Sequence, residues 1–171
     1  MSGIWQVPFR LRLMGALAAA CLLLSASGSF ATTTTSTFTV QITLAATCVI
    51  NSTSTLDFGS QGVLTANVDQ TSTIQVQCTN TTPYNVGLDA GTGTGATVAV
   101  RKLTSGGATV NYTIYSDSGR TTVWGNTVAT DTVAATGNGA AQSYTVYGRV
   151  PAQTTPAPGT YTDTVTVTVT Y

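Results

Sequence analysis

Both ends of the chain, beyond its first thirty residues, alternate strictly between polar and apolar positions. Residues 37–44 place four apolar side chains on one face of an extended strand: Phe38, Val40, Ile42 and Leu44. Residues 164–171 do the same with Val165, Val167, Val169 and Tyr171. A strand at a chain terminus is usually an edge strand, and an apolar edge pairs readily with another chain. The pattern therefore suggests a subunit that gives a strand at one end and needs one at the other.

The same two-residue period recurs between the two ends. It predicts strands near residues 37–50, 55–59, 72–78, 83–89, 96–103, 109–115, 121–124, 143–150 and 160–171. Gly, Thr, Asn and Ser interrupt every apolar run, and no run beyond the first thirty residues has a helical period. Many short strands separated by turns are typical of an all-β sandwich or barrel.

The inward members of these alternations form the predicted core. They are Val49, Leu56, Phe58, Ile74, Val76, Val86, Leu88, Val98, Val100, Val110, Tyr112, Ile114, Tyr144, Val146, Val165, Val167 and Val169. Trp124 is expected to pack within the fold rather than to contact a ligand.

The N-terminus has the features of an export signal. Arg10 and Arg12 form a basic region, residues 11–24 are largely apolar, and Ser29-Phe30-Ala31 has the form of a cleavage site. We therefore expect residues 1–31 to be a signal peptide. A transmembrane helix is disfavoured because the apolar run is short. Lipid attachment at Cys21 is an alternative that lacks the usual leucine before the cysteine.

Charge excludes several kinds of partner. Beyond residue 31 the chain has four basic residues and six aspartates, a formal charge of −2. So few charges of either sign build no electrostatic footprint for nucleic acid or anionic lipid.

The residues needed for most enzyme chemistry are missing. The sequence has no His and no Glu, so the usual general acid–base groups and a Ser-His-Asp arrangement are unavailable. Zinc binding is disfavoured for the same reason. We expect no enzyme activity, no metal, no cofactor and no small-molecule substrate.

Two cysteines remain after cleavage, Cys48 and Cys78. An even pair in an exported protein predicts a disulfide, the alternative being two buried thiols.

These features resemble the spore coat protein U domain family, which is also the pilin domain of archaic, Csu-type chaperone–usher pili. The matching segments, in order, are Cys48, Leu56-Asp57-Phe58-Gly59, Ile74-Gln75-Val76-Gln77-Cys78, Tyr84-Asn85-Val86-Gly87-Leu88-Asp89-Ala90-Gly91, Tyr112-Thr113-Ile114-Tyr115-Ser116-Asp117, Tyr147-Gly148-Arg149-Val150-Pro151, and residues 159–169.

The resemblance implies an incomplete immunoglobulin-like β-sandwich that lacks its last strand and is completed by a donor strand. Residues 32–46 would be the N-terminal donor-strand extension, with Phe38, Val40, Ile42 and Leu44 as its plugs. Residues 47–171 would form the pilin domain. Its last strand, with Val165, Val167, Val169 and Tyr171, would edge the acceptor groove and contact the chaperone.

The function implied is that of a structural pilus subunit supporting adhesion and biofilm formation. Its partners would be a periplasmic chaperone, an outer-membrane usher and neighbouring subunits, and the protein would pass through the periplasm to the cell surface. Two alternatives stay open: a spore or cell-surface coat protein of the same fold, and a glycan-binding adhesin module.

Overall fold

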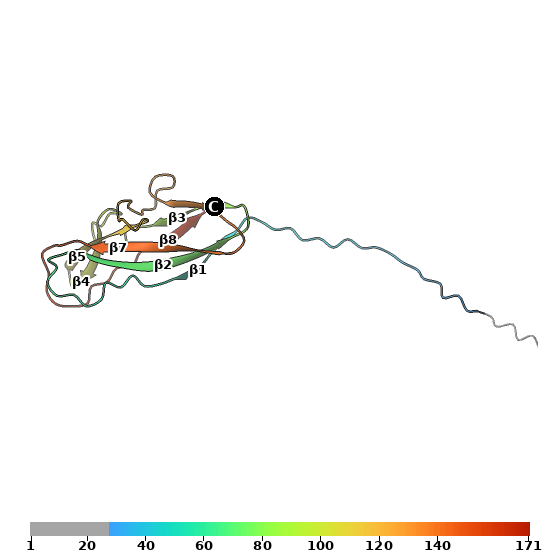
Figure 1. Ribbon diagram of the computed structural model, residues 1–171, viewed down its shortest axis with the longest axis horizontal. Helices are drawn as coiled ribbons and strands as arrows, with labels where there is room; N and C mark the ends of the chain where they lie inside the picture. The colour runs from blue at the N-terminus through green and yellow to red at the C-terminus, as the bar shows by residue number, and fades with distance from the viewer. Residues whose placement is uncertain (1–27) are drawn as a thin grey trace, which may run out of the picture. The chain divides into compact units, whose positions relative to one another are not determined.

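Two antiparallel sheets make up the fold in the computed structural model, which describes residues 28–171. Figure 1 shows β1, β2 and β7 side by side in one layer, with β3 and β8 in the other. The larger sheet has the order β1-β2-β7-β5-β4 and the smaller β6-β3-β8. The strands are β1 (Cys48–Thr53), β2 (Val68–Cys78), β3 (Pro83–Leu88), β4 (Arg101–Ser105), β5 (Ala108–Tyr115), β6 (Val133–Thr136), β7 (Ala141–Val150) and β8 (Val167–Thr170).

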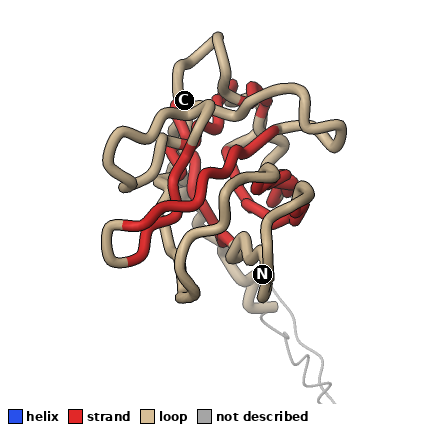
Figure 2. The backbone as a smooth tube through the Cα atoms, turned by 90° about the vertical axis from the view of Figure 1, so that its left-hand side faces the viewer, coloured by secondary structure: helices blue, strands red, loops and turns tan. Residues whose placement is uncertain are grey.

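The predicted fold class is confirmed. Residues 28–171 contain strands, turns and long loops but no helix (Figure 2), so no helix in that range is long and apolar enough to cross a membrane. The described chain divides after Gln41, and both sheets belong to the second unit, residues 42–171. Most of the predicted signal peptide, residues 1–31, and the alternative lipid site at Cys21 lie outside the described residues.

The core lies between the sheets and follows the sequence alternation. In β2 the inward side chains of Ile74, Val76 and Cys78 are buried, whereas Gln75 and Gln77 between them are only half-buried. β2 pairs with β7 along its whole length, from Val68 opposite Val150 to Gln77 opposite Ala141. This long central ladder fixes which face of each strand points inward.

Most of the predicted core is buried or packs against the buried cluster. Trp124 is 1% exposed, and its indole N–H donates to the Val86 carbonyl at 2.8 Å, which confirms its packing role. The core also includes five residues that the alternation did not select: Leu64, Cys78, Tyr84, Trp124 and Val150.

Two predicted core residues are wrong. Val49 is 49% exposed because it lies opposite Gln77 on the outer face, while Ile50, opposite Val76, takes the inner face. Val100 is 44% exposed because it closes a turn with Thr97 before β4 begins. Val98 is only half-buried.

Several predicted strands also differ from the structure. Residues 37–47 and 55–59 form no strand, and 121–124 contributes only an isolated bridge between Val123 and Tyr115. The strand expected over 96–103 begins at Arg101, and that over 160–171 is regular only in β8. β6 was missed because its sequence, Val-Ala-Ala-Thr, has too little apolar contrast to mark a strand.

Cys48 and Cys78 form the predicted disulfide. They lie directly opposite each other on β1 and β2. The bond therefore ties the edge strand β1 covalently to its neighbour β2 in the larger sheet.

An ion-pair cluster lies on the outer face of the same sheet. Arg149 on β7 donates two hydrogen bonds to Asp69 on β2, at 2.7 and 2.8 Å, and Arg120 lies 3.4 Å from the same carboxylate. The hydrogen bond from Arg149 holds the pKa of Asp69 below its usual range. Exposed pairs of this kind contribute about 1 kcal/mol or less to stability.

Replacing both cysteines by alanine should destabilise a chain of residues 32–171 by roughly 3–4 kcal/mol, because the bond closes a long loop in the unfolded chain. Urea denaturation of the oxidised protein and of the Cys48→Ala/Cys78→Ala variant measures the difference. A reductant should lower the midpoint of the unsubstituted chain and leave that of the variant unchanged. Equal midpoints for both oxidised proteins would contradict the prediction.

Candidate functional site

The two sheets are open along one side. β1 is the last strand of the larger sheet, and β8 is the last strand of the smaller sheet. The two strands approach each other, but within the described residues no ladder joins them. Each therefore presents an edge of backbone groups toward the space between them.

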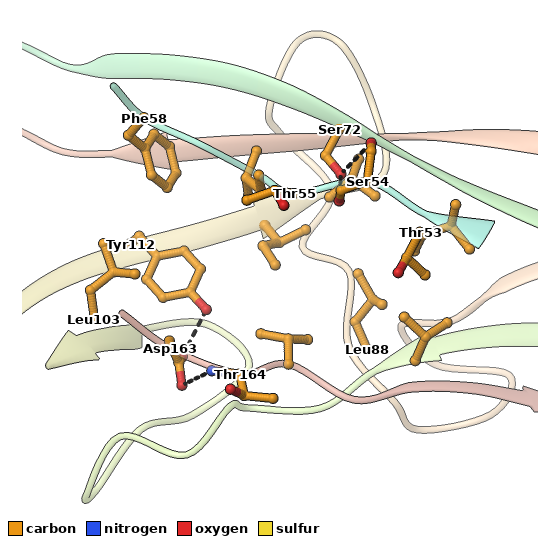
Figure 3. Close-up of a pocket in the computed structure, with 16 residues that line it drawn as sticks. Thr53, Ser54, Thr55, Phe58, Ser72, Leu88, Leu103, Tyr112, Asp163 and Thr164 are labelled. Carbon is orange, nitrogen blue, oxygen red and sulfur yellow. Dashed lines mark hydrogen bonds between the residues drawn. The ribbon is translucent and has the colours of Figure 1, made fainter. Parts of the chain in front are cut away.

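A cavity of about 410 Å³ opens at this side, between the segment that follows β1 and the segment that leads into β8. Figure 3 shows Thr53, Ser54 and Thr55 along one wall and Asp163 and Thr164 along the other. The floor is apolar and comes from both sheets: Ile74, Leu88, Ile114 and Val146. The space thus reaches the core.

A second cavity, of about 780 Å³, continues the first. Both are lined by Leu56, Phe58 and Leu103, and the second extends between residues 57–64 and 155–161. Phe58 lies edge-on to Tyr112 at the junction, with ring centroids 6.1 Å apart. Together the cavities form one depression with an apolar floor and a partly polar rim, which we call the groove.

The four residues predicted to edge the groove differ in their positions. Val165 and Val167 line it, and they and Val169 are half-buried against the core. Tyr171 is 60% exposed and lines neither cavity. On the facing strand, Ile50 points to the inner side and is still 41% exposed. Inward apolar residues at both edges thus remain partly open to solvent.

The four predicted plugs are the most exposed apolar side chains of the region that follows Phe30. Phe38, Val40, Ile42 and Leu44 are 81–86% exposed, and their segment forms no strand. Just before β1, Thr47 exchanges hydrogen bonds with Thr79, which anchors the start of the sandwich. Alternate residues of 38–44 thus present four large apolar side chains to solvent.

Sequence reasoning missed the residue that supports the groove wall from beneath, Arg101. It is 0% exposed, and its guanidinium donates to four carbonyl oxygens at 2.7–2.9 Å: Leu88, Asp89, Val98 and Trp124. Burial lowers its pKa. The only signal in the sequence was a charged residue inside a run with a strand-like pattern. Such a residue is equally consistent with an exposed surface position.

A buried tyrosine also faces the groove wall. The Tyr112 hydroxyl donates to Asp163 Oδ2 at 2.8 Å (Figure 3). Burial raises the pKa of Tyr112 well above its ordinary value, and the hydrogen bond to Asp163 raises it further. This hydroxyl is therefore a permanent donor rather than an acid–base group.

Comparison with known proteins places this arrangement in a family. Residues 34–168 match the profile of the Spore Coat Protein U domain. The chain belongs to this family. Spore Coat Protein U domains are structural coat and pilin domains rather than a known enzyme family.

Two similar proteins support the assignment. The chain is 32% identical over 173 residues to Protein U of Myxococcus xanthus, covering 92% of this chain and 96% of that protein. Its structure resembles a chain of the CsuC–CsuE chaperone–tip adhesion subunit pre-assembly complex from the archaic chaperone–usher Csu pili of Acinetobacter baumannii. That match has a TM-score of 0.54 and 26% identity, and it covers 75% of this chain but only 40% of the other.

Replacing Arg101 by methionine should destabilise the domain by about 3 kcal/mol or more, because several buried carbonyls lose their donor. Arg149→Met is the matched control, since its ion pair is on the outer face, and it should cost about 1 kcal/mol or less. Urea denaturation measures both. Equal losses for the two variants would show that the buried guanidinium has no special role.

Proposed function

We propose that this protein is a structural subunit of a surface fibre, in which residues 32–46 of one copy insert as a strand into the groove of the next. The observation that carries the proposal is that the groove and the exposed N-terminal segment complement each other. The groove is a depression with an apolar floor and an open edge on each side, and residues 38–44 carry an alternating apolar face whose side chains are more than four-fifths exposed.

Strand insertion suits both the groove and this segment physically. Backbone groups of the inserted segment would pair with the edges of β1 and β8, and alternate side chains would enter the groove and fix the register. Burying four large apolar side chains contributes on the order of 6–12 kcal/mol as an upper bound. Each contact joins two different surfaces and does not close, so repeated contacts produce a fibre.

The same groove explains the other partners. Before assembly an open core exposes apolar surface, which is an aggregation hazard. A periplasmic chaperone would cover the groove, gripping the β8 side and Tyr171, and an outer-membrane usher would pass subunits to the cell surface. The similar Csu structure is a complex with a chaperone, which favours this route. Adhesion and biofilm formation would follow from the fibre.

A coat function is the second candidate, favoured by the match of residues 34–168 to the Spore Coat Protein U domain. A coat could assemble through the same strand insertion, so the two candidates differ in the final structure rather than in the contact. Negative-stain images of cells that express the protein with a chaperone and an usher separate them: thin fibres support the pilus, and a continuous layer supports the coat.

Deleting residues 32–44 should give a subunit that still co-purifies with its chaperone but forms no fibres, because the groove remains and the donor is gone. Pull-down on the chaperone and electron microscopy of the cell surface measure the two properties. Fibres of normal length from this deletion would rule out the donor role.

A single charge should act in the same way. Ile42→Asp places a carboxylate on the apolar face and should abolish assembly, whereas Gln41→Asp, one residue away on the polar face, should leave it intact. Size-exclusion chromatography with light scattering of the purified mature chains measures assembly. Equal behaviour of the two variants would mean that the alternating face does not enter a groove.

Complementation tests the direction of the contact. Val167→Arg should block the groove but keep the donor, and Ile42→Asp should keep the groove but lose the donor. Neither chain should assemble alone, and a mixture should form a one-to-one complex that grows no further. Fibres from the mixture, or no complex while both chains are folded by circular dichroism, would contradict a head-to-tail contact.

A further inference from the structure

One wall of the groove passes from one sheet to the other without regular pairing of its own. Thr162 exchanges backbone hydrogen bonds with Thr104 on β4, at the edge of the larger sheet. From Val167 onward the chain pairs with β3, in the smaller sheet. Residues 163–166 lie between these two anchors, and they keep the alternating burial of a strand although they are outside any regular strand.

Two aspartates hold this crossing segment. Asp163 Oδ1 accepts hydrogen bonds from the Thr92 amide at 2.7 Å, the Thr92 hydroxyl at 2.9 Å and the Thr164 amide at 2.8 Å. In the opposite direction, Asp89 Oδ1 accepts from the Thr166 amide at 2.9 Å. The Asp163 carboxylate of the crossing segment thus binds the backbone at Thr92, and the Asp89 carboxylate binds the backbone of the crossing segment at Thr166.

Further bonds make the contact rigid. Asp89 also accepts from the Gly91 amide at 2.9 Å, and its own amide donates to the Thr166 carbonyl at 3.1 Å. Partial burial opposes ionisation of Asp89, but the hydrogen bonds from Thr166 and Gly91 outweigh it and hold its pKa below the usual range. On the far side of Asp163, Oδ2 accepts the Tyr112 hydroxyl. A charged acceptor makes each of these bonds stronger than a neutral one.

Gly91 shows how closely the two sides meet. Its φ is +77°, and a Cβ at this position would collide with the Asp163 carboxylate. Only glycine can therefore adopt this left-handed backbone conformation and let the Asp163 carboxylate lie so close.

Apart from Thr92, these residues belong to three separate segments that carry the family resemblance, 84–91, 112–117 and 159–169, yet none of them is an apolar plug or a core valine. We propose that Asp89 and Asp163 are positioning residues that hold residues 163–166 as a preformed groove wall for the incoming strand. We call the pair, with the Thr92, Thr164 and Thr166 amides that it binds, the aspartate clasp. The inference rests on the proposed strand insertion.

The clasp acts on binding through preorganisation. An incoming strand pairs with a wall only if the wall is already extended, since ordering backbone at the moment of binding costs affinity. The backbone hydrogen bonds to β3 keep β8 extended. The carboxylates of Asp89 and Asp163 keep residues 163–166 extended. Loss of the clasp should therefore weaken strand binding more than it weakens the fold as a whole.

The test uses the full mature chain with Ile42→Asp, which keeps its groove but cannot donate, and a fluorescent synthetic peptide of residues 32–46. In this background Asp163→Ala should weaken peptide binding at least tenfold, because several hydrogen bonds to the wall are lost. Asp163→Asn should recover most of that affinity, since its carbonyl oxygen still accepts from the Thr92 and Thr164 amides. Fluorescence anisotropy measures the dissociation constant.

The matched control is Asp117→Ala in the same background. Asp117 also accepts bonds from two amides, those of Thr121 and Thr122, but it lines neither cavity of the groove. It should lower the urea midpoint without changing peptide affinity. Hydrogen exchange adds a local readout. The amides of Thr164 and Thr166 should exchange faster in Asp163→Ala than in the parent chain, and at the parent rate in Asp117→Ala.

The outcomes separate the two proposals. If the Ile42→Asp chain itself binds no peptide, strand insertion is wrong, and the positioning role is wrong with it. If it binds and Asp163→Ala binds equally well, only the positioning role is overturned. If Asp163→Ala does not fold, Tyr112→Phe supplies the measurement, because it removes one donor to Asp163 and should weaken binding about fivefold; unchanged affinity would overturn the clasp.

Discussion

A β-sandwich buries its core only where its two sheets are closed along their edges. In this chain the edge strands β1 and β8 are not joined by a ladder, so the sandwich is open between them. Most of the groove's features follow from this constraint. The valines before and within β8 are half-buried, Ile50 points inward and is still exposed, and two connected cavities reach the core. Leu88 and Val146 form part of the floor and are only 2% and 4% exposed, so the groove is open at its rim rather than at its floor.

Without support, the two edge strands of an open sandwich would move together and close the groove. Here contacts that lie outside the groove hold each edge strand in place. On one side the disulfide between Cys48 and Cys78 keeps β1 on the larger sheet. On the other side Arg101 binds the carbonyls at the end of β3, and the aspartate clasp binds the segment before β8. These contacts replace the support that a strand in the groove would give to its neighbours.

The sequence predicted what depends on local pattern. Alternation located β2, β3, β5 and β7 to within a few residues, and two cysteines in an exported chain were enough for the disulfide. The pattern failed where both phases of a run are apolar, as at Val49 and Ile50, where only the pairing with β2 decides which side chain points inward. It also failed over residues 37–47, because alternation predicts a strand only if a partner is present.

The candidate site was less predictable, since its supports join residues far apart in the chain. Asp163 meets Thr92 across 71 positions, and no short-range pattern in a single sequence encodes that contact. Arg101 reads as a surface charge until its four carbonyl partners are known.

The buried Arg101 guanidinium also constrains how the domain folds. Its acceptors come from three places: the end of β3, the loop before β4 and Trp124. A guanidinium that is buried before all its acceptors are in place keeps an uncompensated cost of lost hydration. Intermediates with only part of this set are therefore high in free energy. Burial of Arg101 therefore favours docking of the three segments together, which brings the carbonyls behind one wall of the groove into place as a set.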